Sequence, residues 1–183
     1  AEQGCSALGY VIAAPQLGEQ LLALSEAKKN ITWLSPAQFQ QMTQNTQSIT
    51  AHIKNHDPIS ADLMIIAEGA QSATRMQQAF STWTRDYEQY AIVANISFNH
   101  AKPGIAYQRF TKNGTLALLL LGATRFTLVW TVPAQHYADW QALSDEDFLK
   151  KIQAVIGFQL GQGYDLGPRQ AYPLKAVFVE KAY

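Results

Sequence analysis

An Asn-Gly pair between two apolar stretches limits the folds open to this chain of 183 residues. Asn113–Gly114 separates the stretch 105–111 from the continuous apolar run Leu116–Leu121. The tightest hairpin turns favour Asn-Gly because both residues of such a turn need positive φ angles. Another short turn follows at 122–124, and Arg125–Val132 is the next extended stretch. These residues predict consecutive antiparallel strands.

The neighbouring residues enlarge this sheet and add a helix. Gln89–Phe98 alternates apolar and polar residues as a half-buried strand does, so we expect a four-stranded antiparallel meander. Ser144, followed by the acidic trio 145–147, predicts a capped helix start. The helix would end at Gly157 and bury the stripe Phe148, Ile152, Val155 and Ile156. The last stretch, Arg169–Val179, is expected to be extended.

The first half mixes one helix with shorter β stretches. Leu17, Leu21 and Leu24 recur on one helical face after Pro15, which favours a helix of about three turns. The β stretches expected here are Gly9–Ile12, Ile31–Leu34, Gln38–Gln44 and Ser48–Ile53, the last two paired across a turn. The continuous apolar run Asp62–Ala67 is typical of a strand buried on both faces.

Charge and composition argue against several classes of function. Fourteen basic residues balance fourteen acidic ones, so we expect no nucleic-acid partner. Charged residues make up only 15% of the chain. Because typical proteins have about 25%, we expect the surface to be covered by further segments, a partner or a bilayer. His52 and His56 straddle a β-like run and would not share a helix face, so no metal site is expected. No residue is proposed as catalytic.

The junction after residues 62–67 carries the pattern most specific for a function. Glu68-Gly69 is followed at fixed spacing by Ser72 and Arg75. A strand that ends in acid-Gly-x-x-Ser-x-x-Arg resembles the second fingerprint of flavoprotein aromatic hydroxylases, in which this turn contacts the cofactor. Glycine permits close backbone approach, and an acid can orient groups on a cofactor. The resemblance implies that Glu68, Gly69, Ser72 and Arg75 bind the cofactor, and a plain polar turn is the alternative.

The resemblance extends over nearly the whole chain. The segments that carry it are Gly9–Ile12, the leucine helix, Tyr87–Asn95, Gln108–Thr111 with Gly114, Phe126–Trp130, Ser144–Phe148 and Arg169–Leu174. Their order is similar to that of p-hydroxybenzoate hydroxylase-like flavoproteins. Within that family the chain looks most like the ubiquinone-biosynthesis branch, the 2-polyprenyl-6-methoxyphenol hydroxylase type.

The resemblance implies an α+β fold in three parts. Residues 1–85 would form an incomplete part of the FAD-binding domain. Residues 86–175 would form the substrate-binding domain, an antiparallel or mixed β-sheet packed by helices, and 176–183 would begin the return to the FAD domain. The family's Gly-x-Gly-x-x-Gly opening and its later Gly-Asp motif are not found in this sequence. We therefore expect an inactive middle fragment that retains no FAD by itself.

For the full protein, the resemblance implies an enzyme that uses FAD, NAD(P)H and O2 to hydroxylate a polyprenylated phenol in ubiquinone biosynthesis. By alignment to p-hydroxybenzoate hydroxylase, Leu119, Leu121 and Val129 take the positions of polar substrate contacts. They would form an apolar wall for a ring with a prenyl tail and no carboxylate, the alternative being ordinary core residues under the helix. The expected location is cytoplasmic, with peripheral contact to the inner membrane or to a ubiquinone-biosynthesis complex.

Two other functions stay open. A non-catalytic β-sheet module that binds an apolar ligand would explain the low charge and the apolar strands, although it gives no role to the Glu-Gly turn. A diverged, inactive homologue would explain the departures from the family pattern. Those departures are Glu68 where Asp is usual, Ala13-Ala14 in place of a polar pair, and Thr115 and Leu120 where the ubiquinone branch usually carries prolines.

Overall fold

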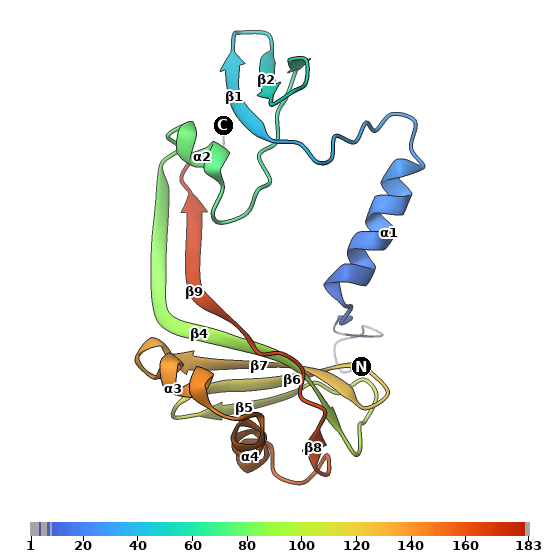
Figure 1. Cartoon of the computed structure of the whole chain (residues 1–183), viewed down its shortest axis with the longest axis vertical. Helices are drawn as coiled ribbons and strands as arrows, with labels where there is room; N and C mark the ends of the chain where they lie inside the picture. Colours follow the sequence, from blue (N-terminus) through green and yellow to red (C-terminus); the bar gives the residue numbers. More distant parts are fainter. Residues whose placement is uncertain (1–3, 5–6, 8, 182–183) are drawn as a thin grey trace. The chain divides into compact units, whose positions relative to one another are not determined.

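The chain folds as two units in the computed structural model, which describes Gly4, Ala7 and residues 9–181 (Figure 1). Unit 1 takes in the residues up to Gln20 together with Asp86–Lys175. Unit 2 takes in Leu21–Arg85 together with the residues from Ala176 onward. Each unit has a β-sheet of its own.

The sheet of unit 1 is built on strands that the alternating pattern predicted. Its strands are β4 (Thr82–Phe98), β5 (Tyr107–Thr111), β6 (Gly114–Gly122), β7 (Arg125–Pro133), β8 (Gly163–Tyr164) and β9 (Gln170–Val179). The order is β5-β6-β7-β4-β8, and β9 also pairs with β4. Strands β4 and β9 both continue past the boundary of the unit. The predicted hairpin is confirmed, but its two turn residues are Lys112 and Asn113, because Gly114 already belongs to β6 and pairs with Thr111.

The predicted four-stranded meander is wrong in one connection. Strands β5, β6 and β7 follow one another as antiparallel neighbours, but β4 lies beside β7 and does not pair with β5. The segment 99–106 that joins β4 to β5 is longer than a tight hairpin turn, so it allows this rearrangement. The apolar stretch 90–98 of β4 thereby lies at the centre of the sheet, where both of its edges are paired.

One face of this sheet is covered by α4 (Asp145–Ile156), and the hydrophobic core lies between them. Alternate residues of the central strands point into that core: Ile92, Ile96, Phe98, Leu116, Leu118, Phe126, Leu128, Trp130 and Val132. From α4 come Phe148, Ile152 and Ile156, as the sequence predicted, whereas the fourth predicted residue, Val155, is only partly buried against this core. The Ser144 side chain accepts a hydrogen bond from the Asp147 amide at 3.1 Å, and Gly157 ends the helix at φ +72°. A 3-10 turn (Ala134–His136) and α3 (Tyr137–Ala142) connect β7 to this helix.

Unit 2 has a three-stranded sheet and a short helix. Strands β1 (Phe39–Gln44), β2 (Ile49–Ile53) and β3 (Ile59–Ala61) pair antiparallel in that order. Asn45 closes the β1–β2 turn by accepting hydrogen bonds from the amides of Gln47 and Ser48. Helix α2 (Ala73–Gln77) follows the Glu-Gly motif.

The predicted helix after Pro15 is confirmed as α1 (Ala14–Glu26), which has no buried residue. No helix in the described part of the chain is long and apolar enough to cross a membrane.

Three predicted strands are wrong. Residues 9–12, 31–34 and 62–67 are irregular. A strand needs a neighbour for its backbone hydrogen bonds, and none of these stretches pairs with a strand of the described residues. The run 62–67 was predicted to be buried on both faces, yet Leu63 and Ile65 are 71% and 78% exposed. The fold of unit 2 therefore leaves these two apolar side chains largely exposed to solvent.

Candidate functional site

The Glu68 carboxylate closes a tight turn at the start of α2. Its Oε2 accepts hydrogen bonds from the Ser72 hydroxyl at 2.6 Å and from the Thr74 amide at 3.1 Å. Its Oε1 accepts one from the Thr74 hydroxyl at 2.8 Å. The Ser72 hydroxyl in turn accepts from the Arg75 amide at 3.0 Å, as a helix N-cap does. We call residues 68–75 the motif turn. The Glu68 carboxylate stabilises this turn through its hydrogen bonds to Ser72 and Thr74.

Arg75 and Gly69 occupy the other side of the motif turn. The Arg75 guanidinium donates to the backbone oxygens of Gly69 and Ala70, the first at 3.2 Å. Its Nε is buried and has no hydrogen-bond partner among the described residues. Gly69 has φ +82°, and a Cβ added there would meet no atom within 4 Å. The backbone at Gly69 is therefore open to close approach, in a conformation that other residues rarely adopt.

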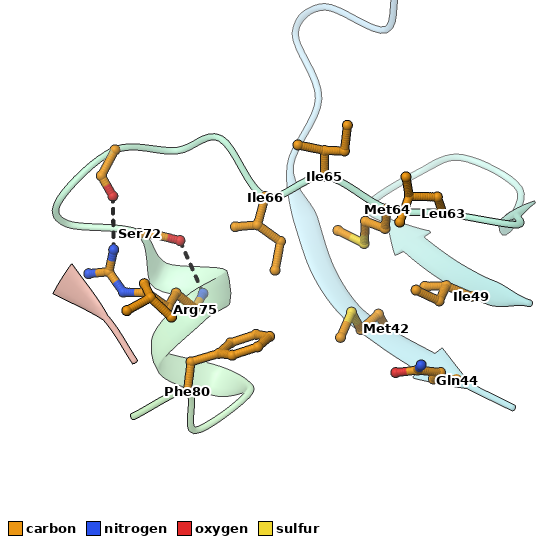
Figure 2. A pocket seen from close by; sticks show the side chains of 12 residues that line it. Met42, Gln44, Ile49, Leu63, Met64, Ile65, Ile66, Ser72, Arg75 and Phe80 are labelled. Carbon is orange, nitrogen blue, oxygen red and sulfur yellow. Dashed lines mark hydrogen bonds between the residues drawn. The ribbon is translucent and has the colours of Figure 1, made fainter. Parts of the chain in front are cut away.

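A cavity of about 510 Å³ lies against this turn in unit 2. Gly69, Ser72 and Arg75 line it, whereas Glu68 does not. Figure 2 shows Ser72 and Arg75 on one side of the cavity and Met42 on the other. The rest of the lining is mostly apolar: Ile49, Leu63, Met64, Ile65, Ile66, Phe80 and Val179.

The backbone of the motif turn, rather than the Glu68 carboxylate, is the part that could contact the diphosphate of a flavin dinucleotide. Gly69 leaves open space above the main chain, and the cationic Arg75 lies beside it. Both carboxylate oxygens of Glu68 are already bonded to Ser72 and Thr74. Such a cofactor would therefore meet Gly69 and Arg75, and Glu68 would hold those two in place.

The hydrogen bonds of the motif turn lower the pKa of Glu68 below its ordinary value of 4.5, with the Ser72 hydroxyl as the largest cause and Thr74 next. A depressed folded-state pKa means that the carboxylate stabilises the fold above pH 4.5. This contribution is lost as the pH falls through the folded-state value. We expect Glu68→Gln to be less stable than the wild type at pH 7, and the difference to narrow as the pH falls below 4.5, measured by thermal unfolding across this range.

A second substitution removes the Thr74 hydroxyl and leaves the charge of Glu68 in place, so it tests the hydrogen bond by itself. Thr74 is only 2% exposed, so Thr74→Val is expected to lower the free energy of unfolding by about 1–3 kcal/mol at pH 7. Thr50→Val is the matched control, because the hydroxyl of Thr50 makes an exposed bond to Ser60 at 2.8 Å. Equal losses at the two threonines would contradict a structural role for the Glu68 contacts.

The second group of predicted site residues lies in unit 1, and two of them, Leu119 and Val129, lie on the face of the sheet opposite α4. We call this the open face, and it consists of Ala91, Val93, Asn95, Ser97, Thr115, Ala117, Leu119, Arg125, Thr127, Val129 and Thr131. Leu119 pairs with Thr127, and Val129 pairs with both Ala117 and Val93. The open face is therefore apolar along its middle.

Leu119, Leu121 and Val129 are half-buried and lie outside the core cluster under α4. Leu119 and Val129 share the open face, and Leu121 lies in the β-bulge at the end of β6. The alternative interpretation, core residues beneath the helix, does not describe these positions. Leu116, Leu118 and the other alternate residues of β6 and β7 fill that core instead.

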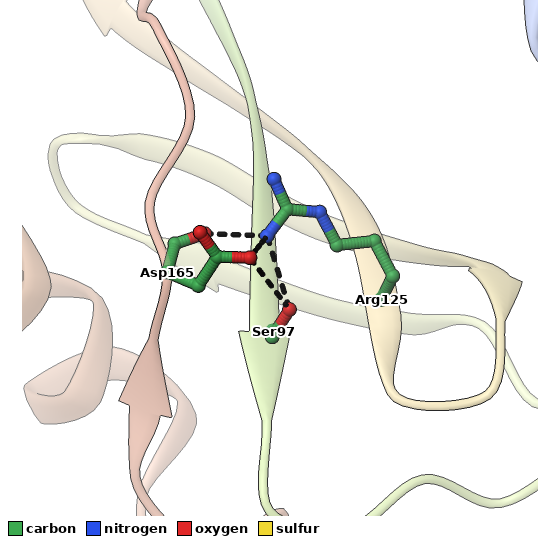
Figure 3. A network of polar contacts seen from close by, with 3 residues as sticks. All are labelled: Ser97, Arg125 and Asp165. Carbon is green, nitrogen blue, oxygen red and sulfur yellow. Dashed lines mark hydrogen bonds and ion pairs between the residues drawn. The ribbon is translucent and has the colours of Figure 1, made fainter.

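One end of the open face is polar. Figure 3 shows the guanidinium of Arg125 between the Asp165 carboxylate and the Ser97 hydroxyl. Its Nη1 donates to Asp165 and, at 3.0 Å, to Ser97. The backbone amide of Gly167 also donates to the Asn95 carbonyl at 2.7 Å, which ties the same loop to β4. The positive charge of Arg125 is thus paired with an acid.

Sequence reasoning missed Thr74, Asn95 and Thr127. Thr74 lies within the motif but at a position that the pattern leaves unspecified, and no signal in the sequence marks its contacts to Glu68. Asn95 and Thr127 are brought together by the β4–β7 register, which the predicted meander did not contain. Within the described residues, no group of His, Cys, Asp and Glu side chains could hold a metal ion.

Comparison with known proteins places these features in context. No protein-family model matches the chain. It is 26% identical to ubiquinone hydroxylase UbiL of Rhodospirillum rubrum over 91% of its length, and 26% identical to an uncharacterised protein of Synechocystis over 92%. Human ubiquinone biosynthesis monooxygenase COQ6 is 26% identical over 81% of the chain. The chain spans 39% of UbiL, 42% of the Synechocystis protein and 34% of COQ6.

Solved structures agree on the fold. The flavin-dependent halogenase CmlS superposes with a TM-score of 0.70 over 90% of this chain and 32% of its own, at 11% identity. The OxyS anhydrotetracycline hydroxylase of Streptomyces rimosus gives 0.56 over 91% and 33%, at 14% identity. The predicted α+β fold class and the predicted resemblance are both confirmed. The chain is thus similar in sequence to ubiquinone-biosynthesis monooxygenases and has the fold of flavin-dependent hydroxylases and halogenases.

Proposed function

We propose that this chain is part of a flavin-dependent monooxygenase that hydroxylates the aromatic ring of a polyprenylated phenol in ubiquinone biosynthesis. The observation that carries the proposal is its similarity to a ubiquinone hydroxylase over 91% of the chain. The motif turn and the apolar open face support it, because one suits a dinucleotide and the other suits an apolar aromatic substrate.

The chemistry divides between the cofactor and the chain. FAD, when bound and reduced by NAD(P)H, supplies the activation of O2. The chain contributes binding and orientation. Gly69 lets the cofactor approach the backbone, and Arg75 places positive charge beside it. Glu68 and Ser72 keep this turn in shape.

The substrate would lie on unit 1. Leu119, Leu121 and Val129 offer an apolar surface for the ring and the start of its prenyl tail. Such a surface also keeps water away from the reacting ring. The paired charge of Arg125 gives no attraction for a free carboxylate, which suits a neutral phenol.

In this proposal residues 1–85 and 176–183 would belong to the FAD-binding domain and 86–175 to the substrate-binding domain. The boundaries of the structural units after Arg85 and Lys175 support this division, whereas the residues up to Gln20 group with unit 1. Because a polyprenylated phenol dissolves in lipid, the enzyme would work at the inner membrane surface or in a ubiquinone-biosynthesis complex.

A second candidate is a non-catalytic module that binds an apolar ligand. The apolar middle of the open face favours it, since that surface alone would hold a lipid-like molecule. A diverged, inactive homologue is the related case, favoured by the inward-facing Glu68. The three candidates differ in whether flavin binds and whether NAD(P)H reduces it.

The test uses the protein made from the complete open reading frame that encodes this chain. We expect visible flavin absorbance that bleaches on addition of NAD(P)H. Gly69→Val is expected to raise the Kd for FAD at least about tenfold, because a side chain would fill the space above the backbone that the diphosphate approaches. The Kd is measured by fluorescence titration of the apoprotein.

Gly104→Val is the matched control. Gly104 has φ +74° and a Cβ there would also meet nothing within 4 Å, so valine enters a similar left-handed φ without the cofactor contact. The FAD affinity of this variant is expected to equal that of the wild type. A folded protein that ignores added FAD would contradict the proposed function and leave the apolar module or the inactive homologue.

A further inference from the structure

One cross-strand row of the open face combines an apolar residue with a polar pair. Leu119 pairs with Thr127, and Thr127 pairs with Asn95 on the next strand. The Thr127 hydroxyl donates to the Asn95 Oδ1 at 3.0 Å. This bond turns the amide nitrogen of Asn95 away from Thr127. Among the described residues that nitrogen has no hydrogen-bond partner, and the side chain is exposed.

The surroundings of Asn95 determine what its amide can recognise. Val93 and Val129 form the next row of the open face, one side-chain repeat away along the strands. In the other direction lies Arg125, whose charge is paired with Asp165. A ligand that reaches Asn95 therefore meets an apolar surface, an uncharged N–H donor and no free positive charge.

We propose that Asn95 is a specificity-determining residue whose amide N–H donates to a neutral oxygen substituent, a hydroxyl or methoxy group, on an aromatic ring lying against Leu119 and Val129. The inference rests on the proposed function and names the group that fixes the ring's orientation. Thr127 acts as a positioning residue, because its hydroxyl fixes which end of the amide faces the ring.

The energetic basis is the cost of leaving the amide donor unpaired. A ring on this surface excludes water from Asn95. A ring with an oxygen substituent restores the lost hydrogen bond, whereas a ring without one leaves a desolvated N–H unsatisfied. The row should therefore discriminate between two ligands that differ only in that oxygen.

The experiment compares two probes that share a prenyl tail, 2-prenylanisole and prenylbenzene. The methoxy oxygen only accepts hydrogen bonds, so it reports on a donor alone. We expect the protein from the complete reading frame to bind 2-prenylanisole about five- to tenfold more tightly by isothermal titration calorimetry. In Asn95→Asp the carboxylate cannot donate, and the preference should disappear. Thr127→Val should keep a reduced, about two- to threefold, preference.

Asn113→Asp provides the matched control, because it makes the same change at the exposed tip of the β5–β6 hairpin. It should keep the full preference for 2-prenylanisole. Equal binding of both probes by the wild type, or an unchanged preference in Asn95→Asp with native circular dichroism, overturns the assignment of Asn95 and leaves the proposed function standing. If neither probe binds the wild type, the proposed function itself is contradicted and the inference falls with it.

Discussion

Replacing Phe148 by alanine is expected to lower the free energy of unfolding by about 3–5 kcal/mol. Phe148 is fully buried in the core between α4 and the sheet. Its ring packs against the indoles of Trp130 and Trp140, with centroids 5.9 Å and 6.1 Å away, and the Arg169 guanidinium lies 5.0 Å from its centroid. Alanine would leave a cavity that the two rigid indoles cannot fill by small movements.

Urea unfolding followed by tryptophan fluorescence measures this loss, since Trp130 and Trp140 border the site. Phe158→Ala is the control, because Phe158 is 76% exposed and its replacement should change the free energy by no more than about 0.5 kcal/mol. A loss below about 1 kcal/mol at Phe148 would mean that α4 does not cover the sheet as described.

The position of Phe148 in this core could be predicted from the sequence because every signal for it is local. The Ser144 cap, the acidic first turn and the apolar spacing of α4 lie within a few residues of one another. Strand periodicity is equally local, and within the continuous apolar run of β6 it places Leu118 and Leu119 on opposite faces, of which only Leu118 belongs to the core. Patterns of this kind depend only on helix and strand periodicity.

The order of the strands required information that is not local. Alternation shows that 89–98 is a strand but does not say whether β5 or β7 lies beside it. The prediction of a strand at 62–67 was wrong for a related reason. Its apolar residues indicate burial, but burial depends on a partner strand, and the described residues provide none. Composition can predict a strand only where its neighbours are present.

In the candidate site, too, the local pattern could be predicted from the sequence and the contacts that depend on other residues could not. The spacing of Glu68, Gly69, Ser72 and Arg75 located the motif turn correctly, since the four residues do lie together. The direction of the Glu68 carboxylate could not be foreseen, because it depends on the Thr74 hydroxyl and on the longer side chain of Glu reaching it. In the structure, the glutamate that stands at position 68, where Asp is usual, accepts a hydrogen bond from Thr74 within the motif turn.

Leu119→Arg is expected to weaken the binding of a prenylated phenol such as 2-prenylphenol by roughly 100-fold. The change removes apolar contact from the middle of the open face and forces an unpaired cation to lose water when the ring binds. The fold should tolerate it, because Leu119 is half-buried and lies outside the core under α4. Calorimetric titration of the complete protein gives the Kd, and unchanged thermal unfolding verifies the fold.

Leu119→Arg should change the affinity in opposite directions for two different ligands. This distinguishes a change in ligand recognition from a general loss of the fold. 4-Hydroxybenzoate carries a carboxylate that can pair with the new guanidinium, so its affinity should not fall and is expected to rise. Leu119→Met keeps an apolar side chain of similar volume and should change the Kd of 2-prenylphenol by no more than about threefold. Parallel losses for both ligands in Leu119→Arg would show that the open face does not select the ring by its charge. The substrate wall would then have to lie elsewhere than on Leu119 and Val129.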